Sequence, residues 1–478
     1  MALISPSNLL SLHESSRKQT AALNVSPSRR YRYVADGNGK EQPLDIPDPA
    51  LFNGINAVDH GSPVLPSISE CAIHLEMLEA FHSLRREVLQ SSQLDVAFDI
   101  TPQRTTKYRV KRGTSRSRNR EVDTVFIADS GFVDRRTQKW THFLHIAATR
   151  FRQWIQMVDS NLDKAQLGSP APRYLLLPPL DVLMIWHAFL LNCDDFKEHC
   201  AFHNLNHVQN VEFPWSDIHA AIDSSSWRYT LPKEHSDWLL TTHNIHGNLV
   251  KSLSEEASQP GLIQSLLHAF YDPKARFGFL DTSHLAQTLR KARQTQELNT
   301  PLVQNVERQC VFVDKMHAHR WIRSPAVDGT LRRAIDRYDN FLHLFRLYPN
   351  QFLVPTLDID LVWHTHQCSA AKYRTFVTER VGRFINHEDK IGRGTLDYGF
   401  TNAEQWYRLQ YGEQYQVCLC WSCEAILSAV EGLDEDVLDD PDPQIGGLVT
   451  DVERKVHYYR EVEIARRLGR EMPIWNHE

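Results

Sequence analysis

One sequence pattern occurs twice in this chain, and it constrains the fold more than any other feature. Proline, leucine, aspartate, tryptophan and histidine recur in the same order in residues 177–189 and in residues 354–367. The offset between the copies is a constant 177 residues, and it joins Pro178 with Pro355, Asp181 with Asp358, Trp186 with Trp363, and His187 with His364. We therefore predict two pseudo-repeats of one helix-loop-helix unit.

The similarity between the copies extends beyond the motif itself. Phe196 falls opposite Tyr373 at the same offset. Upstream, the group Arg150, Phe151 and Trp154 resembles the group Arg337, Tyr338 and Phe341, with ten additional residues in the first copy. We predict a mainly α-helical body with few short strands. Its expected parts are a mostly disordered lead at 1–65, repeat one at 66–250, repeat two at 251–430, and an acidic loop with a C-terminal helix at 431–478.

Several individual elements are expected from local patterns. Ser67 and Glu70 form a capping box, which predicts a helix start. The other expected elements are helices at 140–158 and 328–347, two helices within 251–300, extended segments at 122–133 and 310–313, and a last helix from Leu448 to about residue 470 capped by Thr450 or Asp451.

Composition indicates an intracellular protein. Fifty-three Lys and Arg residues face 59 Asp and Glu residues, for a net charge of −6, so no overall attraction to nucleic acid or anionic membranes is expected. No apolar run approaches the ~20 residues of a membrane span, and the first residues lack a signal-peptide pattern. The eight cysteines should be reduced unless they bind metal or act in redox chemistry. We expect a cytoplasmic location and no membrane partner.

A basic stretch at residues 103–120 holds eight Lys and Arg residues and no acid. Its sharper interpretation is a phosphate-binding or nuclear-targeting segment. Its blander interpretation, which we favour, is a solvated loop inserted in repeat one. A nucleic-acid partner is therefore not expected. Nuclear localisation through this loop remains an alternative to the cytoplasmic location.

The motif of repeat two could support chemistry. Thr356 is placed to cap a helix, and Asp358 would favour the positive end of the helix dipole. Asp360 and His364 are four residues apart and share a helix face, so the carboxylate could orient the imidazole or both could ligate one metal. His366 would point about 200° away from His364 on a regular helix.

Repeat one differs at the polar positions of the motif. Leu183 lies opposite Asp360, and Phe189 lies opposite His366. The candidate catalytic residues are therefore Asp360, His364 and His366 of repeat two, with His187 as a contributor from repeat one. We expect Asp360 and His364 to face a shared cavity with His366 or His187 at its rim. The competing interpretation is that the Trp-His pairs are packing units.

Two further groups are candidate metal ligands. His364 and His366 are candidates in the motif, and Cys418, Cys420 and Cys423 lie within six residues, although buried cysteines also act as small apolar residues. The run His387-Glu388-Asp389 fits part of a two-histidine, one-carboxylate iron site, with His457 as a conceivable third ligand. The sequence contains no P-loop, dinucleotide fingerprint, nucleophile elbow or H-E-x-x-H motif. It identifies no particular cofactor and sets no oligomeric state.

These motifs resemble the glycine-rich-domain-containing-protein-like family of plants and fungi. The resemblance rests on the paired P-x-L-D-x-x-x-x-W-H runs and spans roughly residues 65–430. Residues 70–76 and 418–423 are similar to fungal members in particular. The resemblance implies a mostly helical region with repeated Trp-His motifs, and it implies a fold more than a reaction.

Two functions of different kinds remain open. The first is an enzyme of fungal specialised metabolism that acts on an apolar small molecule in a pocket lined by Trp, His and Asp at the repeat junction. Its reaction would be metal-assisted, or a cofactor-free cyclisation or isomerisation. The second is a non-catalytic helical scaffold whose charged loops dock partners.

Overall fold

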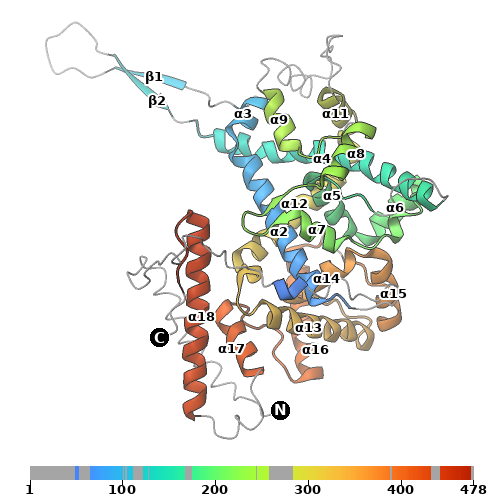
Figure 1. Cartoon of the computed structure of the whole chain (residues 1–478), viewed down its shortest axis with the longest axis vertical. Coiled ribbons are helices and arrows are strands. Elements are labelled where there is room, and N and C mark those ends of the chain that lie inside the picture. The colour runs from blue at the N-terminus through green and yellow to red at the C-terminus, as the bar shows by residue number, and fades with distance from the viewer. Residues whose placement is uncertain are drawn as a thin grey trace, which may run out of the picture. The chain divides into compact units, whose positions relative to one another are not determined.

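The computed structural model confirms the mainly α-helical fold with few short strands (Figure 1). It describes residues 49–52, 65–98, 100, 102, 105–110, 122–127, 129–166, 175–243, 245–257, 284–387, 390–431 and 442–474. The predicted lead before residue 49, the predicted helix around residues 262–270 and the acidic run 432–441 lie outside these ranges. None of the described helices is long and apolar enough to cross a membrane.

The chain forms two compact units, and each unit is built from separate stretches of the sequence. Unit 1 contains residues 1–80, 190–229 and 311–478, and unit 2 contains residues 81–189 and 230–310. The helices α2 (Ile68–Gln90) and α12 (Gln296–His319) contribute residues to both units. The boundaries predicted for the two repeats stay predictions.

Unit 1 holds the second motif helix, α14 (Leu357–Gln367). Its other complete elements are η1 (Pro49–Phe52), α6 (Cys193–His203), η3 (Val208–Asn210), α7 (Trp215–Ala221), β3 (Ile222–Asp223), β4 (Arg228–Tyr229), η4 (Trp321–Arg323), α13 (Val327–Leu347), α15 (Ala370–Val381), α16 (Arg393–Tyr411), α17 (Trp421–Glu431) and α18 (Asp442–Leu468). Helix α13 is central to this unit because it contacts α14, α15, α16 and α17. Helix α14 therefore packs against the apolar side of α13.

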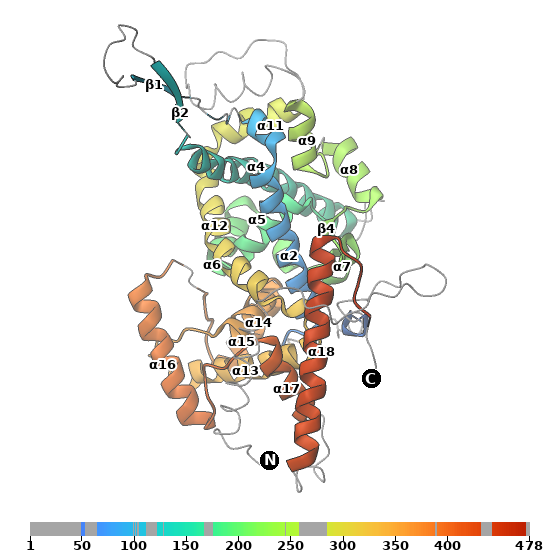
Figure 2. The ribbon, with the colours of Figure 1, turned by 90° about the vertical axis from the view of Figure 1, so that its left-hand side faces the viewer.

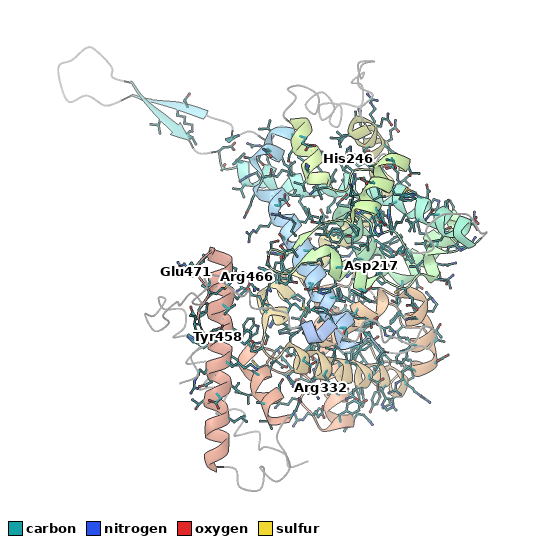
Figure 3. The ribbon with its side chains drawn as sticks, viewed as in Figure 1. Asp217, His246, Arg332, Tyr458, Arg466 and Glu471 are labelled. Carbon is teal, nitrogen blue, oxygen red and sulfur yellow. The ribbon has the colours of Figure 1, made fainter. Side chains whose placement is uncertain are left out.

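Charged and aromatic contacts join the outer helices of unit 1. Arg332 of α13, labelled in Figure 3, pairs with Glu431 at the end of α17, with 2.6 Å between Nη2 and Oε2. Helix α18 runs beside α17, as Figure 2 shows. Tyr458 and Val462 of α18 are buried and pack with Tyr459 and Met472.

Unit 2 holds the first motif helix, α5 (Leu180–Leu190), apart from its last residue, Leu190, which belongs to unit 1. Its other elements are α3 (Ser92–Ala97), β1 (Thr105–Val110), β2 (Val122–Ile127), α4 (Phe132–Gln166), α8 (Lys233–His243), α9 (Leu249–Ala257) and α11 (His284–Gln294). The long helix α4 contacts α3 and α11, and α3 contacts α9. The strands β1 and β2 pair in antiparallel register from Thr105 opposite Ile127 to Val110 opposite Val122.

The predicted capping box is present at the start of α2. The backbone N–H of Ser67 donates to Glu70 Oε2 at 2.7 Å, and the backbone N–H of Glu70 donates to Ser67 Oγ at 3.2 Å. The helix predicted at 328–347 is also confirmed, because α13 spans Val327–Leu347. The helix predicted at 140–158 lies inside the longer α4.

Other local predictions were wrong in whole or in part. Residues 310–313 lie inside α12, because Val306, Gln309, Val313 and Met316 are buried at the spacing of a helix rather than a strand. The extended segment predicted at 122–133 stops with β2, and α4 begins at Phe132. Residues 105–110 of the predicted basic loop form strand β1.

Two predicted helix caps are also corrected. Helix α18 begins at Asp442, so Thr450 and Asp451 lie within it; Pro443 favours the earlier start because proline is well suited to the first turn. Thr356 occupies the N-cap position of α14 but makes no side-chain capping bond. Its hydroxyl oxygen instead accepts a hydrogen bond from Arg337 Nη2 at 3.2 Å.

Candidate functional site

Both motif helices are held at their first turn by a buried arginine–aspartate pair. In unit 2, Arg150 Nε lies 2.8 Å from Asp181 Oδ2, and Arg150 Nη2 donates to the backbone carbonyl of His246. In unit 1, Arg337 Nε lies 2.7 Å from Asp358 Oδ2, and its Nη2 donates to the carbonyl of Tyr415. The two arrangements are of the same kind, while the pseudo-repeat as a whole stays a prediction that superposing the two helix sets would test.

The electrostatics of these pairs follow from their burial. Burial raises the pKa of Asp181, although Arg150 attracts its charged form. Burial alone would lower the pKa of Arg337, but the neighbouring charge of Asp358 outweighs it and raises that pKa. Asp181 and Asp358 therefore anchor the first turns of their helices through an arginine, a partner that the helix-dipole interpretation of the motif did not include.

The motif tryptophan of unit 1 begins a chain of hydrogen bonds. Trp363 is buried, and its indole N–H donates to the hydroxyl of Tyr373 on α15 at 2.8 Å. The same hydroxyl donates to the backbone carbonyl of Ile385 at 2.6 Å. Helix α15 ends at Val381 and is capped by Gly382. The φ of Gly382 is 85°, a left-handed conformation that glycine adopts readily. The segment after α15 is thus tied against α14.

This tie places His387 next to the polar face of α14. His387 Nε2 lies 3.1 Å from His364 Nε2 and 3.4 Å from Asp360 Oδ1. His364 Nε2 lies 3.3 Å from the same oxygen of Asp360. Three potential ligand atoms therefore form a nearly equilateral triangle, in which Asp360 and His364 come from one helix face and His387 comes from a loop.

The three side chains of the cluster differ in exposure, and the ligand atom Asp360 Oδ1 is itself buried. The side chain of Asp360 is 22% exposed and that of His387 is 13% exposed, whereas that of His364 is only 2% exposed. Burial alone would raise the pKa of Asp360, but its attraction to His364 and His387 and the charge of Lys315 lower it instead. Asp360 is therefore a carboxylate at neutral pH.

Aromatic rings enclose the two histidines. The ring of Phe312 lies 4.4 Å from that of His364, and the ring of Trp363 stands edge-on to His387 at 5.0 Å, measured between ring centroids. Apolar walls around a polar cluster lower the local dielectric and strengthen its electrostatic interactions.

The structure places the other predicted site residues elsewhere. His366 is buried on another side of α14, where its Nδ1 lies 3.2 Å from the hydroxyl of Tyr338, and burial lowers its pKa to about 3. This matches the divergence expected for histidines two residues apart. His187 is buried in unit 2, with its ring 5.6 Å from that of Phe81.

Repeat one lacks the features that assemble the cluster. Leu183 stands at the position of Asp360, and Phe196 stands at the position of Tyr373 and has no hydroxyl with which to tie a loop. Among the described residues, His187 joins no group of three or more potential metal ligands.

The sequence pattern suggested different co-ligands for His387. It joined His387 with Asp389, which lies outside the described residues, and with His457. The structure brings His387 to Asp360 and His364 instead, and it places His457 on α18. The only sequence signal for His387 as a third ligand was its position shortly after the motif helix and the helix that follows it. That position does not reveal which way the side chain points.

A second group of potential ligands lies at the start of α17. The sulfur atoms of Cys418, Cys420 and Cys423 all lie within 4.8 Å of one another. All eight cysteines lie in the described part of the chain, and none of them forms a disulfide bond there.

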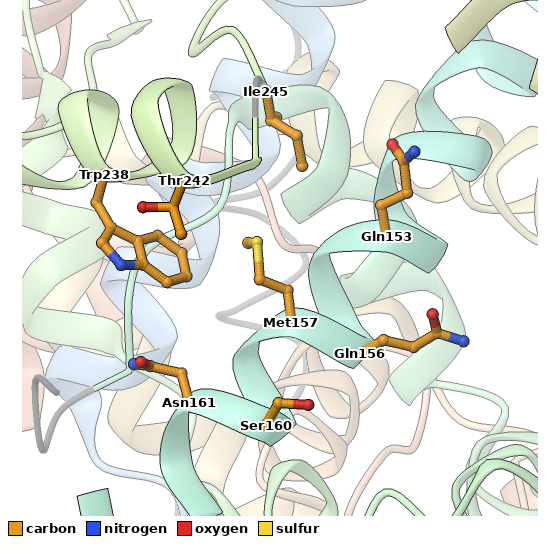
Figure 4. Close-up of a pocket in the computed structure, with 8 residues that line it drawn as sticks. All are labelled: Gln153, Gln156, Met157, Ser160, Asn161, Trp238, Thr242 and Ile245. Atoms are coloured by element: carbon orange, nitrogen blue, oxygen red, sulfur yellow. The ribbon is translucent and has the colours of Figure 1, made fainter. Parts of the chain in front are cut away.

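Unit 2 contains an open pocket of about 630 Å³ between α4 and α8 (Figure 4). Helix α4 contributes Gln153, Gln156, Met157, Ser160 and Asn161, and the opposite wall is formed by Trp238, Thr242 and Ile245. The lining residues that the structure describes include no acid, base or histidine, so they offer hydrogen bonds and apolar surface but no proton-transferring group. The pocket lined by Trp, His and Asp that we expected at the repeat junction stays a prediction.

Comparison with known proteins gives a partial match. Glycine-rich domain-containing protein 1 of Arabidopsis thaliana is 32% identical over 125 residues, which cover 24% of this chain and 14% of that protein. Glycine-rich domain-containing protein 2 of the same plant is 26% identical over 254 residues, which cover 50% of this chain and 26% of that protein. This chain thus spans about a quarter or less of the length of either relative, and no solved structure matches it.

The two relatives are plant proteins, so the expectation of a fungal-type member stays a prediction. A family model described as glycine-rich domain-containing protein-like matches residues 241–376, a range that includes α14 with Asp360 and His364. Over residues 241–376 the chain is therefore similar to the glycine-rich domain-containing protein-like family.

Proposed function

We propose that Asp360, His364 and His387 bind one divalent transition-metal ion, and that the protein is a metal-dependent enzyme acting on a small molecule. The observation that carries this proposal is the triangle of Nε2, Nε2 and Oδ1 atoms with edges of 3.1, 3.3 and 3.4 Å. The proposal extends the sequence-based expectation for Asp360 and His364 by naming the third ligand.

The lengths of the two edges at Asp360 favour metal ligands over hydrogen bonds, whereas the 3.1 Å edge between His364 and His387 fits both. Charge-assisted hydrogen bonds between a protonated imidazole and a carboxylate are about 2.7–2.9 Å long. The two histidine-to-Asp360 distances, 3.3 and 3.4 Å, are longer than that. Ligands that share an ion at about 2.0–2.2 Å stand roughly 3.0–3.5 Å apart, and a point about 2.1 Å from all three atoms exists just outside their plane.

The donor set narrows the choice of ion. Two imidazole nitrogens with one carboxylate oxygen suit zinc, iron(II), cobalt(II) or manganese(II), and three ligands on one face leave positions open for substrate and water. A metal ion in such a site polarises a substrate oxygen or lowers the pKa of bound water. Phe312 and Trp363 would favour a substrate with an apolar body, and Lys315 would attract an anionic oxygen.

The proposal retains the expected setting of a cytoplasmic enzyme of fungal specialised metabolism, with an apolar small molecule as substrate. The support for an enzyme is the combination of a carboxylate, two histidines and aromatic rings in one cluster. The alternative is a non-catalytic scaffold in which the same cluster has only a structural role.

Cobalt(II) binding tests the ligand set. At this site, metal-free protein should bind one Co²⁺ with the weak visible bands of nitrogen and oxygen ligation, and Asp360→Asn, His364→Ala and His387→Ala should each weaken this binding by about 100-fold or more. His457→Ala is the matched control, because His457 is also half-buried, and it should bind as the wild type does. Full retention of binding in Asp360→Asn and His364→Ala would rule out the site.

Turnover tests the enzymatic part of the proposal separately. The loaded protein is incubated with small-molecule extract of its source, and the extract is compared by mass spectrometry with one treated with His387→Ala. A compound that only the loaded wild type consumes supports the proposal. Metal binding without consumption of any compound would favour the scaffold, and consumption by metal-free protein would favour cofactor-free chemistry.

A further inference from the structure

Three cysteines in unit 1 form a cluster that the proposed enzymatic site does not use. Cys418 and Cys420 precede helix α17, and Cys423 lies in its first turn. Their sulfur atoms are mutually within 4.8 Å. Cys418 is exposed, and Cys420 and Cys423 are partly exposed, so the cluster can be reached from solvent. Cysteines that only fill a core would be expected to be buried.

We propose that Cys418, Cys420 and Cys423 bind a thiophilic metal ion, such as Zn²⁺ or Cu⁺, through three thiolate ligands. Thiolates around an ion at about 2.3 Å stand roughly 3.8–3.9 Å apart, which lies within the observed limit. No fourth His, Cys, Asp or Glu atom joins the cluster within the described part of the chain. The ion would therefore keep an open position toward solvent, or take the trigonal arrangement available to Cu⁺.

The surroundings of the cluster favour thiolates. Arg460 of α18 lies over the ring of Trp421, with 5.9 Å between its Cζ and the ring centroid, so a positive charge stands beside the residue that follows Cys420. A nearby cation favours the thiolate form of cysteine. Metal binding would displace the thiol protons.

Two tryptophans hold the cysteine segment in place. The indole N–H of Trp321 donates to the carbonyl of Leu419 at 2.9 Å, between Cys418 and Cys420. The indole N–H of Trp421 donates in the opposite direction, to the carbonyl of His319 at 2.8 Å. This reciprocal pair fixes the backbone on both sides of Cys420, so the ligands are largely positioned before an ion binds.

The test uses the full chain, reduced and freed of metal, with Co²⁺ as the probe. Sulfur ligation gives Co²⁺ an intense charge-transfer band in the near ultraviolet that nitrogen and oxygen ligands do not give. We expect this band to saturate when one Co²⁺ is bound at the cysteines, in addition to the Co²⁺ bound at the Asp360 site, and we expect Zn²⁺ to abolish it. Separate titrations with Zn²⁺ and with Cu⁺, each against a chelator for that ion, decide which of the two binds more tightly.

Cysteine variants assign the band. The triple variant Cys418→Ser/Cys420→Ser/Cys423→Ser should lose it, whereas Cys310→Ser, at another half-buried cysteine, should keep it. Asp360→Asn and His387→Ala should also keep it, so failure of this proposal and failure of the enzymatic site are distinguishable. If the triple variant does not fold, Cys418→Ser alone, at the exposed position, should weaken Co²⁺ binding by about 100-fold.

Thiol alkylation gives an independent readout on the wild type. Bound Zn²⁺ should protect three thiols from alkylation and leave the reactivity of Cys310 unchanged. Absence of the sulfur band together with unprotected thiols would overturn the proposal. The proposal would also be overturned if two of the three thiols formed a disulfide in air and excess Zn²⁺ did not prevent it.

Discussion

Replacing Trp363 with alanine should destabilise the protein by about 3–5 kcal/mol, the usual cost of deleting a large buried aromatic side chain. The ring of Trp363 is 4% exposed and packs against Phe341 at 5.7 Å and Phe345 at 6.1 Å, measured between centroids. Denaturant unfolding measures the effect. Trp186→Ala in unit 2 should cost a similar amount, because its ring is buried 5.1 Å from that of Trp154.

Two companion variants separate packing from hydrogen bonding. Trp363→Phe keeps most of the ring but removes the indole N–H, so it should cost about 1 kcal/mol while loosening the segment that carries His387. Trp406→Ala is the control, because Trp406 is only half-buried and stacks on Tyr348. A cost below about 1 kcal/mol for Trp363→Ala would mean that its ring is not part of the core.

Replacing Arg337 with alanine should cost about 3–5 kcal/mol, because it leaves the carboxylate of Asp358 buried without its partner. The side chain of Asp358 is 2% exposed. Its second oxygen, Oδ1, is buried and has no hydrogen-bond partner among the residues that the structure describes. Arg337 is therefore the main compensation for that charge, and its removal should shift the midpoint of unfolding strongly.

A double variant distinguishes a lost bond from a stranded charge. Arg337→Met/Asp358→Leu removes both charges and keeps the volume, so it should be clearly more stable than Arg337→Ala. If the double variant is as unstable as Arg337→Ala, the ion pair itself stabilises the fold, and the cost of Arg337→Ala does not come from an unpaired buried carboxylate. That result would contradict our account of the helix start.

Local geometry made part of the candidate site predictable from sequence. Asp360 and His364 meet because residues four apart share a helix face. His366 points away from His364 because residues two apart lie on different sides of a helix. The three cysteines were predictable as a group because they lie within six residues of one another. The capping box of α2 and the bounds of α13 likewise depend on contacts within one helix.

The remaining ligand depended on tertiary contacts that no local pattern encodes. His387 reaches α14 because the hydroxyl of Tyr373 joins the indole of Trp363 to the carbonyl of Ile385. The sequence instead suggested a neighbour of His387, Asp389, as its partner. The extended segment predicted at 310–313 failed for a related reason, since a short β-branched run does not reveal the long helix around it.

The position of a bound metal ion is the most direct test of the central claim, that Asp360, His364 and His387 form one metal site. Crystals of the metal-loaded protein are measured at the absorption edge of the ion. The account predicts an anomalous peak about 2.0–2.3 Å from Nε2 of His364, Nε2 of His387 and Oδ1 of Asp360. A structure of the loaded protein with no peak between these three atoms would contradict it.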